Sequence, residues 1–157
     1  MKKQFLPLML LASAICSCSE KQPETTEPMI TKTEIQVENG HFTPEIMHRL
    51  GKVGDVQVSP NHAKILYGVT YTSIEQNKGN RELYLMNVDG SENVKITNTP
   101  KSESNARWIN DSQIIYMRSG KLYTATIEGS TLKNETEVAG AEGMEGFELS
   151  PAGDKIM

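Results

Sequence analysis

The side chains of this chain that could take part in catalysis or metal binding are few and widely spaced. The only histidines are His41, His48 and His62. A zinc site needs such residues joined by cysteine or carboxylate ligands at short, regular spacing, and that pattern is missing. We therefore expect surface or capping roles for the histidines, and we predict no metal and no cofactor.

The sequence also lacks the motif that positions the serine nucleophile of a hydrolase. A nucleophile elbow requires G-x-S-x-G between a strand and a helix, whereas glycine–serine neighbours such as Gly90-Ser91 occur in expected β-turns. Asp55 and His62 could be imagined as a dyad, but no serine at an elbow accompanies them. We predict no catalytic residue within this chain.

Both cysteines, Cys16 and Cys18, lie near the amino terminus. Lys2 and Lys3 precede an apolar run over residues 5–15, which is the layout of a secretory signal. That run is too short to span a bilayer. The rest of the chain has no thiol for a disulfide or a metal site.

The segment Ile15-Cys16-Ser17-Cys18 resembles a bacterial lipoprotein signal, in which an aliphatic residue and two small residues precede the cysteine that is lipidated. Cys18 fits the lipidated position better than Cys16, because Ser17 is the small residue before it. A plain secretory signal with incidental cysteines is the alternative. On the lipoprotein interpretation residues 1–17 are removed, and acyl chains on Cys18 tether the chain to a membrane.

Charge and composition point to an exported, tethered protein. Loss of residues 1–17 removes two of the 16 basic side chains and none of the 20 acidic ones, which changes the formal charge from −4 to −6. An acidic chain without basic clusters is a poor candidate for nucleic-acid binding. From Ser19 to Pro28 the chain has no large apolar residue, so we predict a lipidated amino terminus and flexible tether over residues 18–40.

The expected location is the cell envelope, in the periplasm or at the outer membrane. Ser19 follows Cys18, where lipoproteins retained at the bacterial inner membrane commonly have aspartate. The resemblance to lipoprotein signals therefore favours the outer membrane.

Residues 41–51 predict a short helix at the start of the folded domain. Thr43 is a suitable N-cap, Pro44 suits the first helical position, and Gly51 can end the helix. Ahead of this helix, residues 35–37 show the alternation of a short strand.

The rest of the chain alternates apolar and polar residues in short runs, which predicts β-strands. Expected strands cover about 56–58, 64–69, 82–88 and 93–97, then 106–109, 113–118, 121–127 and 136–138. A further pair begins at Phe147 and returns at Ile156. Trp108, Tyr84 and Tyr123 are expected to pack in the core between these units.

One phrase, a strand, a polar turn and a second strand, occurs three times. It runs GDVQVSPNHAKILYGV from Gly54, SNARWINDSQIIYMR from Ser104, and EGFELSPAGDKIM from Glu145 to the last residue. Tyr67 and Tyr116, at matching places, are 49 positions apart, close to the period of a four-stranded propeller blade. A β-sandwich shows similar alternation but is not expected to repeat such phrases in order.

We therefore predict an all-β fold of propeller blades, each with four antiparallel strands, preceded by a short helix and a disordered tether. About two and a third blades are present, too few to close a ring. The expected divisions are a signal peptide at 1–17, the tether at 18–40, and a partial propeller at 41–157, with blades at about 53–100, 101–143 and 144–157.

The phrases SPNHAKILYG and LYLMNVDGSENVKIT resemble the propeller repeats of TolB-like proteins and of the prolyl oligopeptidase (S9) family of serine peptidases. The start of the first unit is similar to the dipeptidyl and acylaminoacyl peptidase group of S9. In that group a short helix leads into the first blade, and an N-K-G-N-type loop, here residues 77–80, precedes the L-Y-L-M strand. The resemblance covers about residues 42–157.

This resemblance implies that the chain is the amino-terminal propeller of a serine exopeptidase that cleaves short peptides. The Ser, Asp and His triad would lie in a carboxy-terminal α/β-hydrolase domain absent from this chain, and the propeller would gate access to it. In some S9 members propeller glutamates bind the substrate amino terminus. Glu142, Glu145 and Glu148 lie in a suitable loop but match no motif, and we expect them to be solvated.

The alternative function is a non-catalytic TolB-like propeller that binds a protein or peptide partner in the cell envelope. The helix before the first blade and the 77–80 loop favour the peptidase, because both lie outside the repeat phrase that the two families share.

Overall fold

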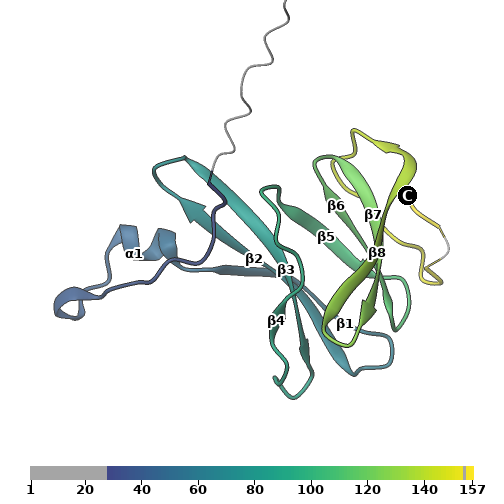
Figure 1. Cartoon of the computed structure of the whole chain (residues 1–157), viewed down its shortest axis with the longest axis horizontal. Helices are drawn as coiled ribbons and strands as arrows, with labels where there is room; N and C mark the ends of the chain where they lie inside the picture. Colours follow the sequence, from purple (N-terminus) through teal and green to yellow (C-terminus); the bar gives the residue numbers. More distant parts are fainter. Residues whose placement is uncertain (1–27, 154) are drawn as a thin grey trace, which may run out of the picture.

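The chain folds into two four-stranded antiparallel sheets that pack face to face (Figure 1). The computed structural model describes residues 28–153 and 155–157, so the expected signal peptide and Cys18 lie outside it. The all-β architecture of four-stranded antiparallel units is confirmed. The strands are β1 (Lys52–Val58), β2 (Lys64–Ser73), β3 (Lys78–Asn87) and β4 (Val94–Lys95) in the first sheet, and β5 (Glu103–Trp108), β6 (Gln113–Arg118), β7 (Lys121–Glu128) and β8 (Thr131–Glu142) in the second.

In each unit a polar side chain at the start of the repeated turn closes that turn with hydrogen bonds to the backbone. In the first unit the Ser59 hydroxyl accepts hydrogen bonds from the backbone N–H groups of Ala63 (3.2 Å) and Lys64 (2.9 Å). In the third unit the Ser150 hydroxyl accepts from the N–H of Lys155 at 3.1 Å. In the second unit the side-chain oxygen of Asn110, Oδ1, accepts from the backbone N–H groups of Ser112 (3.0 Å) and Gln113 (2.9 Å). Polar side chains therefore replace missing backbone partners in all three turns.

A β-bulge interrupts both first strands at matching positions. The register shifts between Gly54 and Gln57 in β1 and between Ser104 and Arg107 in β5. Asp55 and Asn105 each have a φ of 51° at these bulges, a left-handed conformation that aspartate and asparagine tolerate better than most residues.

The bulge in β1 directs Asp55 to an ion pair with Arg81 of β3, at 2.9 Å between Oδ2 and Nη2. The arginine reaches Asp55 by crossing β2 at Gly68. A Cβ on Gly68 would lie 2.6 Å from Nη2 of Arg81, so the absence of a side chain makes this path possible.

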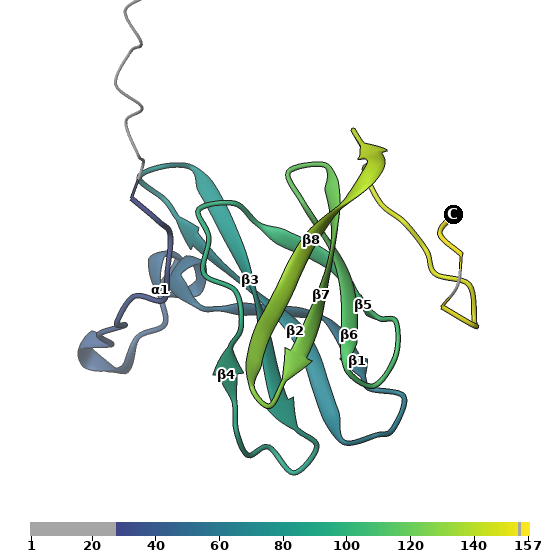
Figure 2. The same ribbon diagram turned by 45° about the vertical axis from the view of Figure 1, so that its right-hand side comes forward.

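The core lies between the two sheets. Strand β5 contacts β1, β2 and β3, and Ala106 and Trp108 pack against the leucines of the first sheet. A smaller apolar cluster lies on the other face of the second sheet, where Phe147 packs with Ile115 and Leu122. Figure 2 shows this carboxy-terminal segment, in yellow, on the side of the second sheet away from the first. Each unit thus begins to cover the one before it.

The segment before β1 forms an arm that leads away from the sheets (Figure 1). Helix α1 (Pro44–Arg49) is capped by Thr43, whose hydroxyl accepts from the N–H of Ile46 at 3.3 Å. The short strand expected at 35–37 does not form, and a 3-10 turn, η1 (Glu38–Gly40), follows instead. In the described part of the chain no strand pairs with residues 35–37, so these residues form no β-ladder hydrogen bonds despite their alternating pattern.

Gly51 has a different role from the one expected. The helix ends through Leu50, whose backbone is extended, and Gly51 does not adopt the left-handed conformation of a glycine cap. A Cβ on Gly51 would lie 2.9 Å from side-chain atoms of both Val69 and Tyr71. Glycine is therefore needed here because β2 approaches closely.

The outer strands differ most from the expected ranges. Strand β4 is short because the Thr97 hydroxyl accepts from the N–H of Leu83 at 2.8 Å, which takes the place of a ladder bond. Strand β8 is longer than the expected 136–138 because it pairs along β7 with two register shifts. Its solvent-exposed residues carry little apolar alternation, so the sequence pattern did not reveal its length.

The Gly68→Ala variant tests the path of Arg81. The added methyl group displaces the guanidinium from Asp55, and we expect the free energy of unfolding to fall by about 1 to 3 kcal/mol. Gly146→Ala is the matched control, because nothing lies within 4 Å of its Cβ position. Chemical denaturation of the purified variants measures both, and equal stabilities would refute the role assigned to Gly68.

Candidate functional site

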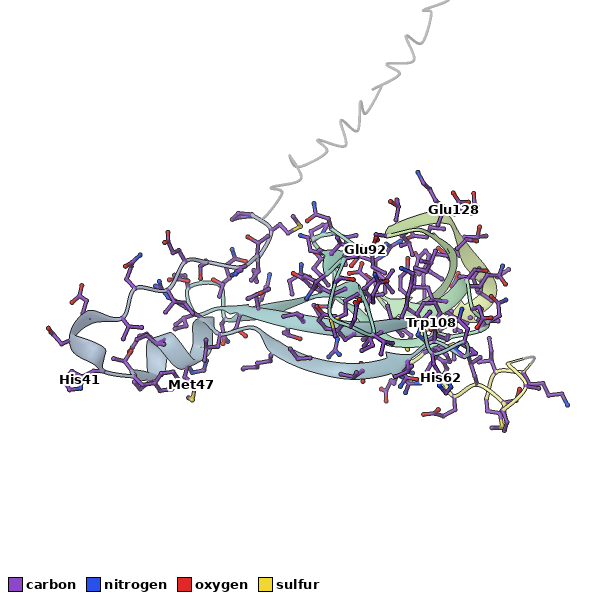
Figure 3. All side chains as sticks on the ribbon, turned by 90° about the horizontal axis from the view of Figure 1, so that it is seen from below. His41, Met47, His62, Glu92, Trp108 and Glu128 are labelled. Carbon is purple, nitrogen blue, oxygen red and sulfur yellow. The ribbon has the colours of Figure 1, made fainter. Side chains whose placement is uncertain are left out.

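The histidines do not form a site with one another. His41 lies on the arm, at the opposite end of the molecule from His62 (Figure 3). His62 occupies a left-handed turn position with a φ of 60°, while Asp55 is paired with Arg81. The dyad considered for Asp55 and His62 therefore does not form. The described part of the chain contains no group of three or more residues suited to hold a metal ion.

The three carboxy-terminal glutamates are exposed, as expected. Glu142 lies 3.9 Å from the Lys121 ammonium group, and Glu148 lies 3.9 Å from the Arg107 guanidinium. The glutamates pair with different strands, which gives no common binding site. The predicted lipidation residue, Cys18, lies outside the described residues, and among those residues no helix is long and apolar enough to cross a membrane.

Trp108 and Tyr123 pack in the core between the two sheets, as expected, whereas Tyr84 does not, because it alternates with Leu83 and Leu85 and its side chain lies on the opposite face of the first sheet. Trp108 is buried, and its indole N–H lies 3.4 Å from the carbonyl oxygen of Gln57 in the first sheet. Tyr84 stacks on Tyr67 and Tyr123 stacks on Tyr116, with ring centroids 5.5 and 6.0 Å apart. The same stacked tyrosine pair therefore recurs in each sheet.

A buried group of polar side chains lies where the first sheet connects to the second. We call Asn80, Glu82, Thr97, Thr99 and Glu103 the carboxylate cluster. Asn80 and Glu82 belong to β3, Glu103 begins β5, and both threonines lie in the connection between the sheets. All except Thr99 are at most 5% exposed. The cluster therefore joins the two sheets through polar contacts.

Thr99 joins the two carboxylates. Its backbone N–H donates to Glu82 Oε1 at 3.0 Å, and its hydroxyl donates to Glu103 Oε1 at 2.8 Å. Glu82 also accepts from the Thr97 hydroxyl at 2.7 Å and from the Asn80 amide at 3.1 Å. Glu82 is therefore well satisfied for a buried carboxylate.

Glu103 is less well satisfied. Its carboxylate is fully buried, the Arg118 guanidinium is 3.6 Å from Oε1, and Oε2 has no hydrogen-bond partner. Burial disfavours the charged form, and the negative charge of Glu82 adds to this, so the pKa of Glu103 is raised to about 7. Glu103 therefore holds a proton at pH values where most glutamates have lost theirs.

Arg118 extends the cluster toward the surface. Its guanidinium lies 4.2 Å from the ring centroid of Tyr123 and donates to both carboxylate oxygens of Glu135 in β8. The Tyr116 hydroxyl also donates to Glu135. Hydrogen bonds from Arg118 and Tyr116 lower the pKa of Glu135 against the opposing effect of burial. Arg118 and Glu135 therefore stay charged at pH values where Glu103 is protonated.

An open groove of about 380 Å³ adjoins the cluster, lined by residues 96–99 on one side and 132–135 on the other. Thr97, Thr99 and Glu135 belong to its walls. Glu82 and Glu103 themselves are inaccessible to a substrate, so their chemistry is limited to holding or releasing a proton. The arrangement suits a junction between sheets and not a catalytic centre.

Neither Glu82 nor Glu103 was among the residues singled out from the sequence. A signal was present in the repeat, because Glu103 occupies the place that Val53 has in the first unit. A charged residue at a position that faces a neighbouring unit indicates a buried polar contact.

No family model matches the chain. The chain is similar to dipeptidyl-peptidase 5 of Porphyromonas gingivalis, with 33% identity over 81 residues, which is 52% of this chain and 12% of that protein. It is also similar to dipeptidyl-peptidase 5 of Porphyromonas endodontalis, with 27% identity over 130 residues, which is 80% of this chain and 18% of that protein. This homology supports a peptidase-related origin. The chain spans less than a fifth of the length of either relative.

The Glu103→Gln variant tests the buried proton. A glutamate has an ordinary pKa of 4.5, and that of Glu103 is about 7. Between these values the folded state keeps a proton that the unfolded state releases, so the free energy of unfolding falls as pH rises. We expect this fall to be about 2 to 3 kcal/mol smaller in Glu103→Gln than in the parent chain.

Denaturation of the purified chain at pH 5, 6, 7 and 8 measures this difference. Glu145→Gln, at an exposed position, is the control and should follow the pH profile of the parent chain. Parallel profiles for the parent chain and Glu103→Gln would show that Glu103 has no raised pKa.

Proposed function

We propose that this chain is the amino-terminal, substrate-gating propeller portion of a lipid-anchored serine peptidase of the S9 family that cleaves short peptides. The observation that carries the proposal is the similarity to two dipeptidyl-peptidase 5 proteins, one of them over 80% of this chain. The stacked four-stranded sheets agree with it, because propeller blades have this architecture.

In this proposal the catalytic serine, aspartate and histidine lie in a carboxy-terminal α/β-hydrolase domain of a longer polypeptide. Among the described residues, four of the five buried polar side chains belong to the carboxylate cluster, which joins one sheet to the other. That is consistent with a rigid scaffold. A scaffold of rigid blades can limit access to an active site by size, so that short or unstructured peptides enter and folded proteins do not.

The proposed location is the cell envelope. Lipidation of Cys18 would anchor the protein, and the segment from Ser19 to Pro28 would hold the propeller away from the lipid surface. The described residues begin at Pro28, and the arm that follows lies at one end of the molecule, away from the second sheet (Figure 1).

The peptidase proposal is tested on the polypeptide encoded by the complete reading frame. We expect that polypeptide to release dipeptides from a chromogenic dipeptidyl substrate and to be labelled covalently by a fluorophosphonate probe, which reacts with activated serines. The 157-residue chain should show neither property.

Two outcomes would contradict this proposal. A complete polypeptide that binds peptides but shows no turnover and no labelling supports the TolB-like alternative. Turnover by the 157-residue chain, abolished by the fluorophosphonate, would show that a catalytic group lies within it.

The anchor is tested separately by metabolic labelling of bacterial cells with an alkyne fatty acid. We expect the parent chain and Cys16→Ala to be labelled and to fractionate with membranes, and Cys18→Ala to lose both properties. Cys16→Ala is the matched control because it removes the neighbouring thiol. Labelling of Cys18→Ala would refute the assignment of Cys18.

A further inference from the structure

The Thr99 hydroxyl has more acceptors within hydrogen-bond distance than it has hydrogens. Its oxygen lies 2.8 Å from Glu103 Oε1 and 2.6 Å from the backbone carbonyl oxygen of Lys101. It also accepts from the backbone N–H of Lys101 at 3.2 Å. A hydroxyl carries a single hydrogen, so Thr99 can donate to the carboxylate or to the carbonyl, but not to both.

A proton on Glu103 resolves this competition. If Oε1 carries the proton, Glu103 donates to Thr99 and leaves the Thr99 hydrogen free for the Lys101 carbonyl. The hydroxyl then accepts two hydrogen bonds and donates one, which is its full capacity. With Glu103 ionised, the hydroxyl donates to Oε1 instead, and the Lys101 carbonyl loses this donor.

The surroundings of the second carboxyl oxygen agree with a proton on Oε1. Glu103 Oε2 is buried and has no hydrogen-bond partner. An ionised Glu103 would place part of its negative charge on this oxygen, whereas in the acid Oε2 is a neutral carbonyl oxygen, which costs less to bury. The Arg118 guanidinium is 3.6 Å from Oε1, which is too far for a hydrogen bond.

The neighbouring charges do not compensate a negative charge on Glu103. The charged and titratable groups around it come from four strands and from the connection between the sheets, and they are Glu82, Tyr116, Arg118, Tyr123, Glu135 and Lys101. Burial raises the pKa of the Tyr116 hydroxyl, which stays neutral. Lys101 is exposed, and Arg118 donates to both carboxylate oxygens of Glu135. An ionised Glu103 would therefore share a single guanidinium with two other carboxylates.

We propose that Glu103, the Thr99 hydroxyl and the Lys101 carbonyl form a proton-controlled switch in the connection between the two sheets. In the protonated state Glu103 donates to Thr99 and Thr99 donates to Lys101, which closes the turn at residues 99–101. When Glu103 releases its proton to solvent, the Thr99 hydroxyl turns to the carboxylate and the turn loses this closure. Because Lys101 is exposed, water can then bind its carbonyl oxygen.

The pH range of the switch follows from the surroundings of Glu103. Burial and the charge of Glu82 raise the pKa of Glu103 to about 7. The closed turn therefore predominates below this pH and the open turn above it. Thr99 also lines the groove between residues 96–99 and 132–135, so the switch changes one wall of that groove. This inference goes beyond the proposed function and does not depend on it.

Carbonyl ¹³C NMR of the 157-residue chain tests the switch, because the shift of a carbonyl carbon reports whether its oxygen accepts a hydrogen bond. As the pH rises from 5 to 9, we expect the Lys101 carbonyl signal to move upfield with the same midpoint as the Glu103 carboxyl signal. In Glu103→Gln the side-chain amide replaces the acid as the donor to Thr99. The Lys101 signal of that variant should therefore stay at its low-pH position throughout.

Two variants of Thr99 separate the switch from a simple effect of charge. Thr99→Ser keeps the hydroxyl, and its Lys101 signal should titrate as in the parent chain. Thr99→Val has a similar shape without the hydroxyl, so Glu103 should still titrate while the Lys101 signal stays constant. Titration of Lys101 in Thr99→Val as large as in the parent chain overturns the inference, because the charge on Glu103 alone then explains the shift. A Glu103 or Lys101 signal of the parent chain that is constant from pH 5 to 9 overturns it as well.

Hydrogen exchange gives a second measurement. We compare the exchange rate of the Lys101 amide with that of an unstructured peptide at the same pH, and we expect its protection to fall about tenfold between pH 6 and pH 8. The Gln113 amide is the matched control, because it donates to the neutral side chain of Asn110 at 2.9 Å. An equal loss of protection at Gln113 would show a general loosening of the fold and would contradict a local switch.

Discussion

Leu66, Leu83 and Leu85 are buried because the second sheet packs over them, and most of the structure depends on that contact. All three are fully buried, although a single four-stranded sheet has no means to cover its own face. Apolar burial stabilises by about 25 cal/mol per Å², so a unit without a neighbour forfeits its main source of stability. Each sheet therefore needs a neighbouring sheet for its stability. The polar groups between the two sheets must then find hydrogen-bond partners within that contact.

The carboxylate cluster shows that adaptation. The connection between the sheets must pass beside β3, and its backbone groups need partners once water is excluded. Glu82 supplies acceptors for this connection, whereas Glu103 remains incompletely paired. A buried charge of this kind is costly, and its raised pKa reflects that cost. The polar contacts determine how the two sheets meet, while the leucines provide the attraction.

Sequence reasoning succeeded where the determinants are local. The N-cap at Thr43, the polar turn after the first strand of each unit and the strand at 113–118 each depend on neighbours within a few residues. The four-stranded units followed from their repetition. It failed where the role of a residue depends on a contact with a residue distant in the sequence. The role of Gly51 depends on Tyr71, the length of β8 depends on β7, and the burial of Glu103 depends on Thr99 from the connection. A short stretch of sequence gives no sign of such contacts.

The self-closing turns have a consequence for the order of events during synthesis. Ser59 and Asn110 close their hairpins with bonds that span five residues or fewer, so each hairpin can form as soon as it leaves the ribosome. The leucines of the first sheet, however, wait for β5 and its neighbours. A growing chain of such units always carries one finished but uncovered face at its newest end. Until the next unit has been synthesised, that face remains exposed and prone to aggregation.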